Sequence, residues 1–295
     1  MSWILYTLVG VIFFSIVNVL DKIILSKYIK NNLTLVVYKS LVWYSVVLLL
    51  PFVGFSMPDP VMLAFIVLAG VIGLIAFVPY VKALAAEEAS RIVPLLQLQS
   101  VFVLLLSFVF MRESLGLLQM IGFSAILVGS FIISVKDFRK LFSVNIAVWL
   151  IAFATFLWAI NIVVFSYCLK NGDFWSVLIL GLVVSSTTSL GLLGVKEIKQ
   201  DFMRNLRDKK SRRILICDGF VHLAGIFGLN LGLLYGSPTL VSVVGGLQGF
   251  FVFVLTVLLS RFFPKILKEN IDRRVLLTKF VAIAFMFAGL VLLNP

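Results

Sequence analysis

Long apolar stretches dominate this chain and leave it few ways to fold. Stretches of 18 or more mostly uncharged, apolar residues are long enough to cross the hydrocarbon core of a bilayer as helices. Because unpaired backbone groups are costly in hydrocarbon, a helix is the form in which each stretch satisfies its own backbone. We predict ten membrane helices, over residues 3–25, 33–54, 60–82, 91–111, 115–135, 146–168, 174–195, 214–235, 238–260 and 276–294.

The composition agrees with a protein that lies almost entirely in the membrane. Of the 295 residues, 62% are hydrophobic and 13% are charged, and the mean hydropathy is +1.16, outside the range of soluble domains. The first apolar stretch has no basic segment before it and no small-residue cleavage pattern after it, which indicates a retained helix rather than a signal peptide. We therefore expect an all-α, multi-pass protein of the cell membrane.

The charged and metal-binding residues exclude several function classes. The net charge is +12, but the basic residues lie in connections between predicted membrane helices, where membrane topology accounts for them. We therefore expect no nucleic-acid partner. Two cysteines, Cys168 and Cys217, and one histidine are too few for a metal site built by the protein. No cofactor is expected, and the expected partners are a small-molecule substrate and membrane lipid; assembly as a homodimer stays open.

The chain contains an internal repeat of five helices. Residues of the same type recur at constant offsets within helices, and the offset changes only in the connections. We therefore divide the chain into two five-helix repeats, residues 1–140 and 141–295. The matching pairs are Asn18 with Asn161, Lys27 with Lys170, Gly70 with Gly225, Gly73 with Gly228, Tyr80 with Tyr235, Gln99 with Gln248, Arg112 with Arg261, and Gly129 with Gly289.

The two repeats are predicted to run in opposite directions across the membrane. A unit that crosses the membrane an odd number of times starts its second copy from the other side. The charges agree: the connection after the second helix has no Lys or Arg, whereas its counterpart, residues 196–213, is strongly basic. Because basic connections face the cytoplasm, we expect the odd-numbered connections to be cytoplasmic and both termini to lie outside.

One segment resembles a known family of membrane carriers. Residues 80–129 read YVKALAAEEASRIVPLLQLQSVFVLLLSFVFMRESLGLLQMIGFSAILVG. They place a Tyr and Ala-Leu at the end of one helix, then a turn of small residues, Pro94 early in the next helix, Glu113 at the following turn, and Gly122 and Gly129 beyond it. This order, together with the five-plus-five layout, resembles the EamA-type members of the drug/metabolite transporter superfamily.

The resemblance implies a carrier but does not identify its substrate. The family is similar in architecture to carriers of amino acids, nucleotide sugars, sugar phosphates and drugs. There are two departures: the Gly-Glu usual at the turn between the fourth and fifth helices reads Arg112-Glu113, and the second copy has Arg261-Phe262, without the acidic residue. The family usually has both termini inside, contrary to the orientation that the charges of the connections predict here.

Polar residues repeated in both halves are the candidate substrate-binding residues. Pro94 marks a helix start, where a missing N–H costs little. Of the glutamines that follow, Gln99 has a partner in Gln248, whereas Gln97 aligns with Gly246. An inverted-repeat transporter binds its substrate at the midplane between its repeats, so we predict that Gln99 and Gln248 face this interface. Hydrogen bonding between helices is the alternative.

Asn18 and Asn161 form a second repeated polar pair, deep in the first and sixth helices. A buried amide in hydrocarbon needs partners, so these residues either line a substrate cavity or bond neighbouring helices. Trp158 shares a helix face with Asn161 and either stacks on a substrate or packs in the bundle. The repeated tyrosines, Tyr80 and Tyr235, complete this set of candidates.

Ionisable residues inside membrane helices are candidates for function. Asp218 and His222 are four residues apart, hence on one helix face, and form the candidate proton-coupling pair. The alternative is that Asp218 lies near its helix start and is stabilised there by the helix dipole and by Arg212 and Arg213. Lys39 is predicted to extend its side chain to the cytoplasmic interface. If it points inward instead, it favours an anionic or zwitterionic substrate.

The basic connection carries a further pattern, because Ile198, Phe202, Met203 and Leu206 have amphipathic spacing. We predict a short helix on the inner leaflet, with its cations near anionic lipid. Asp21, at the end of the first helix, is expected to lie near the interface and to be solvated.

A secondary transporter is the leading hypothesis, because paired polar residues near mid-membrane in an inverted repeat suit alternating access. An enzyme within the membrane needs a nucleophile with a base, or a metal cluster, and a single histidine makes this a poor candidate. A channel needs rings of carbonyls or charges, and no filter-like segment is evident in the sequence. A receptor or scaffold does not need buried amides matched across two copies.

Overall fold

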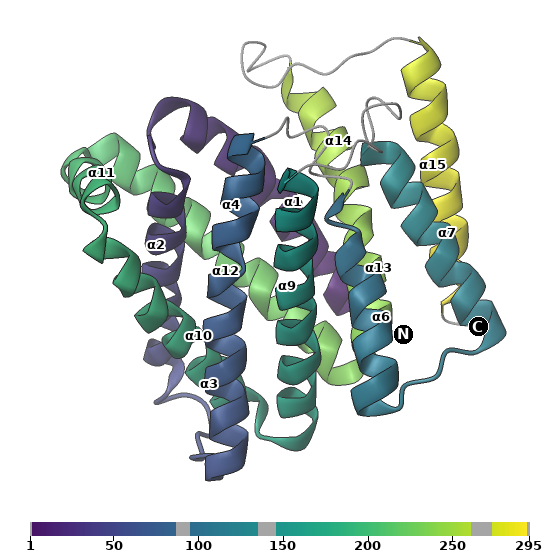
Figure 1. Ribbon diagram of the computed structural model, residues 1–295, viewed down its shortest axis with the longest axis horizontal. Coiled ribbons are helices and arrows are strands. Elements are labelled where there is room, and N and C mark those ends of the chain that lie inside the picture. The colour runs from purple at the N-terminus through teal and green to yellow at the C-terminus, as the bar shows by residue number, and fades with distance from the viewer. Residues whose placement is uncertain (1, 87–94, 135–145, 261–272, 294–295) are drawn as a thin grey trace.

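A computed structural model describes residues 2–86, 95–134, 146–260 and 273–293, and within these ranges the chain is helical and contains no strand (Figure 1). The α-helices are α1 (Ser2–Lys27), α2 (Asn32–Trp43), α3 (Pro60–Ile75), α4 (Phe77–Ala86), α6 (Leu98–Met111), α7 (Leu117–Ser134), α9 (Ile146–Asn171), α10 (Phe174–Leu190), α11 (Lys196–Arg207), α12 (Lys209–Tyr235), α13 (Pro238–Val244), α14 (Gln248–Ser260) and α15 (Arg273–Leu292). Three 3-10 helices continue α2, α10 and α13: η1 (Tyr44–Leu49), η2 (Gly191–Gly194) and η3 (Gly245–Leu247).

The described residues include seven helical segments that are long and apolar enough to cross a membrane. They are Ser2–Lys27, Asn32–Leu49, Pro60–Tyr80, Ile146–Asn171, Phe174–Gly194, Lys209–Tyr235 and Pro238–Leu259. Shorter apolar helices lie at Leu98–Met111, Leu117–Ile133 and Lys279–Leu292. The prediction of an all-α, multi-pass membrane protein is confirmed, whereas ten crossings in two repeats stay a prediction. The helix start predicted at Pro94 lies outside the described residues.

Polar side chains fix where many of the helices begin. Asn31, Asp59, Asp173, Asp208 and Ser237 each accept a hydrogen bond from a backbone N–H in the first turn of the helix that follows, which satisfies donors that have no partner within the helix. A proline also occupies the first turn of α3 and of α13, where its fixed φ suits a helix. These caps place polar residues at the helix ends and leave the interiors apolar.

The end of α6 shows why the related family favours glycine at this turn. Arg112 follows α6 with φ 52 and ψ 32, in the left-handed region, and its N–H bonds the carbonyl of Ser107. Glycine adopts this conformation without steric cost, whereas a residue with a Cβ is strained in it. Arg112 therefore makes this turn at a steric cost that glycine would not have.

Glycines let pairs of helices approach closely. A Cβ added to Gly228 of α12 would lie 2.7 Å from the backbone N of Gly10 in α1. In the same way, a Cβ on Gly122 of α7 or on Gly289 of α15 would lie 2.7 Å from the carbonyl oxygen of the other. Packing of this kind drives helix association in membranes, where lipid tails are as apolar as the side chains. The α1–α12 and α7–α15 pairs are thus fixed by backbone contact.

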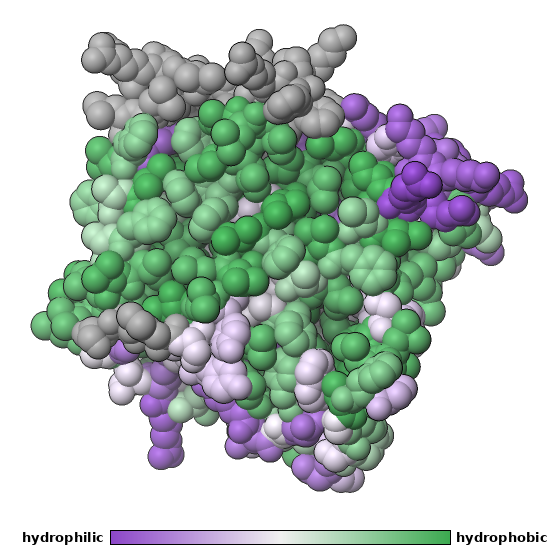
Figure 2. All heavy atoms as spheres, turned by 180° about the vertical axis from the view of Figure 1, so that it is seen from behind, coloured by the Kyte–Doolittle hydropathy of each residue, from purple (hydrophilic) through white to green (hydrophobic). Residues whose placement is uncertain are grey.

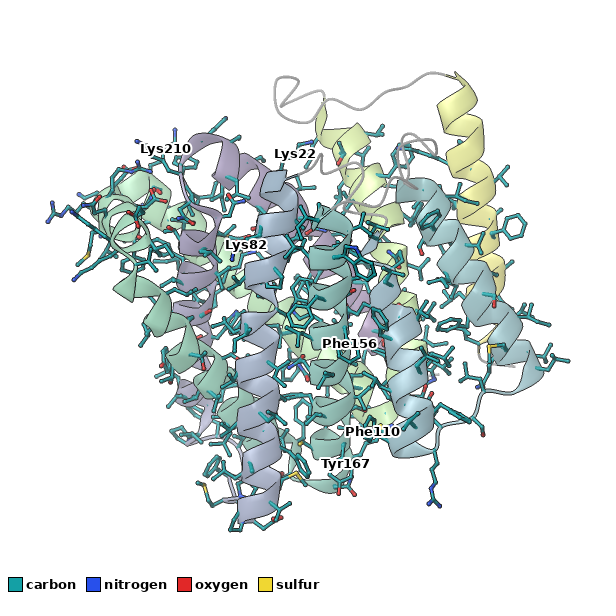
Figure 3. The ribbon with its side chains drawn as sticks, in the orientation of Figure 1. Lys22, Lys82, Phe110, Phe156, Tyr167 and Lys210 are labelled. Carbon is teal, nitrogen blue, oxygen red and sulfur yellow. The ribbon has the colours of Figure 1, made fainter. Side chains whose placement is uncertain are left out.

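The two ends of the bundle differ in charge. The start of α1 and the end of α15 lie toward the same end, and α11 lies at the opposite end (Figure 1). Lys22, Lys82 and Lys210 point toward the end that carries α11, whereas Phe110 and Tyr167 lie in the other half (Figure 3). From behind, the middle of the molecule is covered by hydrophobic residues, and hydrophilic residues gather at one upper corner and along the lower edge (Figure 2).

The amphipathic helix predicted in the basic connection is α11, and part of its apolar face packs on protein. Ile198 and Phe202 are buried, and the ring of Phe202 lies 4.6 Å from that of Tyr38 in α2. The Tyr38 hydroxyl donates a 2.7 Å hydrogen bond to the Phe202 carbonyl. Met203 and Leu206 remain exposed, so only these two apolar side chains of the pattern are open to the surroundings.

The close contact between α1 and α12 predicts a steric effect. We expect Gly228→Ala to destabilise the protein by about 1–3 kcal/mol, because the new methyl group meets the backbone of Gly10, which cannot rotate away. Gly191→Ala is the matched control, since a Cβ there has nothing within 4 Å, and its effect should stay within about 0.5 kcal/mol. Thermal unfolding of the purified protein in detergent measures both. Equal melting temperatures for Gly228→Ala and the control would contradict this packing.

Candidate functional site

A buried cluster of charged side chains joins three helices. Lys39 of α2 places its Nζ 2.6 Å from Asp21 Oδ1 of α1 and 3.4 Å from Asp218 Oδ2 of α12. The side chain of Lys39 is 9% exposed and that of Asp218 is fully buried. Asp21 and Lys39 come from the first half of the chain and Asp218 from the second, so the cluster ties the two halves together inside the bundle.

The position of Lys39 corrects two expectations from the sequence. The predicted extension of Lys39 to the cytoplasmic interface is wrong, because its ammonium group turns inward to two carboxylates. The prediction that Asp21 is solvated is also wrong, because its side chain is only 25% exposed and its carboxylate is paired with Lys39. A charge inside a membrane protein is costly unless it is paired, and the carboxylates offer Lys39 a partner within reach.

Asp218 does not lie at a helix start. The sequence placed the start near residue 214, but α12 begins at Lys209, where Asp208 caps it. Asp218 is therefore nine residues into the helix, about 13 Å along its axis, and pairs with Lys39 instead of relying on the helix start. Its Oδ2 has the Lys39 ammonium at 3.4 Å, whereas its Oδ1 has no hydrogen-bond donor among the described residues. With two carboxylates and one ammonium group, the cluster has a surplus of acceptors.

His222 lies one turn beyond Asp218 and is enclosed by aromatic rings. Its ring is 5.1 Å from Phe14 of α1 and 5.3 Å from Trp43 of α2. Within the described part of the chain, His222 Nδ1 and Trp43 Nε1 are buried without a hydrogen-bond partner, and buried polar atoms of this kind call for an explanation. The structure thus brings the predicted pair Asp218 and His222 to the same junction as Lys39; its role in proton coupling stays a prediction.

A second polar and aromatic group lies where α9 packs on α3 and α4. The Trp158 ring is 5.2 Å from Phe77 and 5.3 Å from Tyr80, and its Nε1 donates a hydrogen bond to the Gly73 carbonyl. Asn161 Nδ2 donates to the Ala69 carbonyl at 2.7 Å. Trp158 and Asn161 therefore bond a neighbouring helix, as one of the two alternatives proposed.

The residues that the sequence alignment pairs with Asn161 and Tyr80 are placed differently. Asn18, the counterpart of Asn161, is exposed in the middle of α1. Tyr235, the counterpart of Tyr80, lies at the end of α12, is 58% exposed and stacks on Tyr6 at 5.8 Å. The expectation that Asn18 is buried is therefore wrong, because its side chain is exposed, whereas Tyr235 lies at the end of α12, away from the charged cluster.

Gln248 and Gln97 contact the other half of the chain. Gln248 Nε2 donates a 3.4 Å hydrogen bond to the Phe14 carbonyl, and Ser15 Oγ donates one to the Gln248 carbonyl. Gln99 is partly buried in the first turn of α6. Gln97, which the repeat argument set aside, lies 3.1 Å from where a Cβ of Gly246 would be. Gln97 therefore lies against Gly246, the residue with which the sequence alignment pairs it.

Sequence reasoning missed three residues of the charged junction: Asp21, Phe14 and Trp43. A signal was present, because Trp43 follows Lys39 by four residues, as His222 follows Asp218, and Asp21 follows Phe14 by seven. Such spacing puts each pair on one helix face. Three helices each carrying a charge and an aromatic group at this spacing would have indicated that the faces meet.

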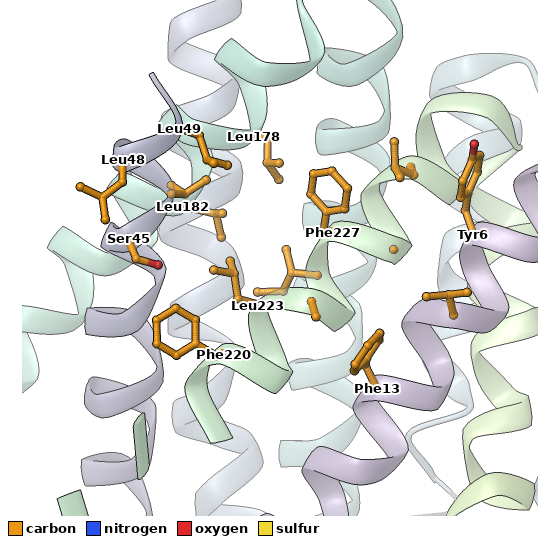
Figure 4. A pocket seen from close by; sticks show the side chains of 16 residues that line it. Tyr6, Phe13, Ser45, Leu48, Leu49, Leu178, Leu182, Phe220, Leu223 and Phe227 are labelled. Carbon is orange, nitrogen blue, oxygen red and sulfur yellow. The ribbon is translucent and has the colours of Figure 1, made fainter. Parts of the chain in front are cut away.

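An apolar pocket of about 610 Å³ lies beside this junction, between α1, η1, α10 and α12 (Figure 4). Its lining is almost entirely hydrophobic, and exposed side chains such as Leu48 and Phe220 stand at its edge. Trp43 packs in the same cluster as Leu182 and Phe227, which line the pocket. Trp43 therefore contacts both His222 and the wall of the pocket.

Comparisons with known proteins agree with this architecture. Residues 1–135 match the family model described as the EamA-like transporter family, which confirms the resemblance found in the sequence. No curated protein matches the chain. One solved structure, described only as a crystal structure of protein, aligns with 99% of this chain and 97% of its own, with a TM-score of 0.73 and 15% sequence identity. At this identity, the likeness shows the fold alone.

The ion-pair cluster predicts a characteristic pattern of stability. We expect Lys39→Met to cost about 3–5 kcal/mol, because it leaves Asp21 and Asp218 buried without their cation. Adding Asp218→Asn to Lys39→Met should recover part of this loss, since one uncompensated charge disappears. Lys199→Met, on the exposed face of α11, is the control. A double variant less stable than Lys39→Met in thermal unfolding would show that the carboxylate and the ammonium do not interact.

Proposed function

We propose that this chain, whose residues 1–135 belong to the EamA-like transporter family, is a secondary active transporter of the drug/metabolite transporter type. It moves a small polar or amphipathic metabolite across the cell membrane by alternating access at the interface of two inverted five-helix repeats. It acts as a carrier and not as an enzyme.

The pairing of helices supports the division into inverted repeats, residues 1–140 and 141–295. Exchanging the halves maps α1 on α9, α2 on α10, α3 and α4 on α12, α6 on α13 and α14, and α7 on α15. Under this exchange the packing of α1 on α12 becomes that of α9 on α3 and α4, and the packing of α2 on α12 becomes that of α10 on α3. The α2–α10, α6–α13 and α7–α15 contacts map on themselves, as expected of elements beside a twofold axis.

The observation that carries the proposal is the charged cluster between the halves. Replacing a buried ion pair by apolar residues is often neutral or stabilising, so a structural protein gains little from Lys39, Asp21 and Asp218 in this place. An intramembrane ionisable group is typical of a substrate or proton pathway. A cluster that both repeats contribute can also be broken and remade when the repeats move relative to each other.

In this mechanism, Asp218 and His222 form the proton-coupling pair and Lys39 is the positive centre that meets the substrate. When Asp218 takes up a proton, Lys39 retains its closer partner, Asp21, and the attraction that draws α12 to α2 is lost. Of the candidate substrate-binding residues, Gln99, Gln248 and Asn18 line the path between the repeats. Trp158 and Asn161 instead hold α9 on α3 through their hydrogen bonds, with Tyr80 beside Trp158, and Tyr235 lies at the end of α12.

Transport by the purified protein in liposomes tests the function. Thermal-shift screening against amino acids, nucleotides, sugars and cationic drugs first identifies a ligand, which is then used radiolabelled. A carrier gives saturable counterflow, and Asp218→Asn should retain counterflow but lose accumulation driven by a pH gradient. Asp59→Asn is the control, since Asn caps a helix as well as Asp does. Flux without counterflow would indicate a channel, and an unchanged gradient response in Asp218→Asn would remove this residue from coupling.

The charges of the connections predict the orientation in the membrane. Because α11 and its basic neighbours should face the cytoplasm, a reporter enzyme fused after Pro295 should be active outside the cytoplasm. A second reporter inserted after Lys199 in α11 should be active inside and serves as the opposite control. Activity of the Pro295 fusion in the cytoplasm would overturn the orientation while leaving the transport proposal intact.

A further inference from the structure

Buried polar atoms without a partner gather at the junction of α1, α2 and α12. Among the described residues, Asp218 Oδ1, His222 Nδ1 and Trp43 Nε1 are buried and have no hydrogen-bond partner. Asp218 is fully buried and Trp43 is 7% exposed. A buried polar atom that loses its bonds to water destabilises the fold unless another partner replaces them, so three such atoms at one junction call for a common partner.

The helices place the three side chains in two neighbouring layers. Lys39 of α2 lies 3.4 Å from Asp218 of α12, and one turn further along both helices the rings of Trp43 and His222 lie 5.3 Å apart. Side chains four residues apart on a helix have their Cβ atoms about 5–6 Å apart. One water molecule with two hydrogen bonds of about 2.8 Å spans a similar distance. A small molecule between the layers is therefore within reach of all three side chains.

The balance of donors and acceptors identifies this small molecule. The Trp43 indole only donates, and the ionised Asp218 carboxylate only accepts. Neutral His222 accepts at Nδ1 when its hydrogen is on Nε2, and donates there in the other tautomer. A metal cation cannot accept a bond from Trp43, and an alcohol has a single hydrogen for two acceptors. Water, with two hydrogens and two lone pairs, satisfies the three atoms in either tautomer.

A polar, exposed strip of α1 leads to this junction. Phe14, Asn18 and Asp21 are separated by four and three residues and so share one face of the helix. Asn18 is exposed and the Asp21 side chain is 25% exposed, whereas the Phe14 ring lies 5.1 Å from that of His222. His222 is half-buried although its Nδ1 is enclosed. The junction thus borders exposed surface, and water can enter it from there.

We infer that one internal water molecule bridges Asp218 Oδ1, His222 Nδ1 and Trp43 Nε1, and that Trp43 is a positioning residue for this water. Buried waters in proteins make about three hydrogen bonds to polar groups that otherwise have no partner, and this junction offers that number. The water site follows from the unpartnered atoms and does not depend on transport.

The consequence for proton transfer rests on the proposed function. When Asp218 carries a proton and His222 is neutral, the carboxyl group passes its proton to the water oxygen while the water passes one of its own to Nδ1. The carboxyl O–H bond and one water O–H bond break, and a water O–H bond and the Nδ1–H bond form. Asp218 becomes a carboxylate and His222 an imidazolium, so the total charge is unchanged. The water thus connects two groups that lie one helical turn apart.

The charged groups around the junction come from its own three helices. They are Asp21 of α1, Lys39 of α2, and Asp218 and His222 of α12. α9 and α13 also pack on α12; Lys170, in the last turn, is the one charged residue of α9, and α13 has no titratable residue. α11 bonds α12 at Ser211, seven residues before Asp218. α10, on which Trp43 packs, has no titratable residue either.

Nuclear magnetic resonance of the indole N–H groups tests the water site without a transport assay. In isotope-labelled protein in detergent, the Trp43 indole proton should show cross-relaxation with a long-lived water, and its signal is identified by its loss in Trp43→Phe. Trp158 is the matched reference, since its Nε1 donates to the Gly73 carbonyl and should show no such water. The absence of a water signal at Trp43, or an equal one at Trp158, would overturn the inference.

A substitution on α12 tests whether the water joins Trp43 to Asp218. Asp218→Leu removes one acceptor of the water and should shift the Trp43 indole signal while leaving that of Trp158 in place. Cys217→Leu, at the exposed neighbouring position, is the control and should shift neither. A Trp43 signal that is the same in Asp218→Leu as in the unchanged protein would show that Trp43 bonds His222 directly, without a bridge to Asp218.

Transport tests the positioning role of Trp43. Trp43→Phe keeps an aromatic ring and removes the N–H donor, so accumulation driven by a pH gradient should fall roughly fivefold, as expected for one lost hydrogen bond, while counterflow stays within about twofold. Trp175→Phe, in α10, is the control and should change neither. Equal losses of accumulation and counterflow, or no loss of either, would overturn the positioning role. No counterflow in the unchanged protein would overturn the proposed function and leave the water site standing.

Discussion

The sharing of one lysine between two carboxylates constrains the rest of the bundle. Lys39 can be charged in the interior only because Asp21 and Asp218 lie within 2.6 and 3.4 Å of it, since an unpaired charge in this environment is costly. The pairing fixes the rotation of α1, α2 and α12 about their own axes. It also sets the faces that these helices present to their neighbours, so Phe14, Trp43 and His222 meet in one aromatic group. The unequal distances leave Asp218 as the less closely held anion.

The surface helix α11 and the charged cluster are linked through α2. Tyr38, which bonds the Phe202 carbonyl of α11, is the residue before Lys39, and Asp201 of α11 accepts the N–H groups of Lys30 and Asn31 in front of α2. The position of α11 is therefore coupled to that of Lys39 by direct contacts. A movement of the repeats that separates Lys39 from Asp218 must also move α11 or break these bonds. The helix α11 at the basic end is thus connected to the buried charged cluster through its contacts with α2.

Several features followed from the sequence, and their limits have physical causes. Hydropathy identified the membrane helices because every backbone group in hydrocarbon must be bonded within its own helix. It placed the start of α12 at residue 214, whereas the helix extends to Lys209, because the cap at Asp208 and not the apolar run decides where the backbone begins to coil. The turn after α6 is left-handed at Arg112, which the residue type did not predict, because a side chain with a Cβ is strained in this conformation.

Helical periodicity determined which residues share a face, and for this reason Asp218 and His222 could be predicted to lie on one face of α12. It did not determine which face of another helix would lie opposite. The inward turn of Lys39, the burial of Asp21 and the contact of Gln97 with Gly246 all depend on partners distant in sequence. The sequence by itself therefore determined the membrane class, the positions of the helices and the polar residues within them. Only the tertiary structure decided which of these residues meet, because the low dielectric of the interior makes a charge depend on neighbours that a one-dimensional pattern does not specify.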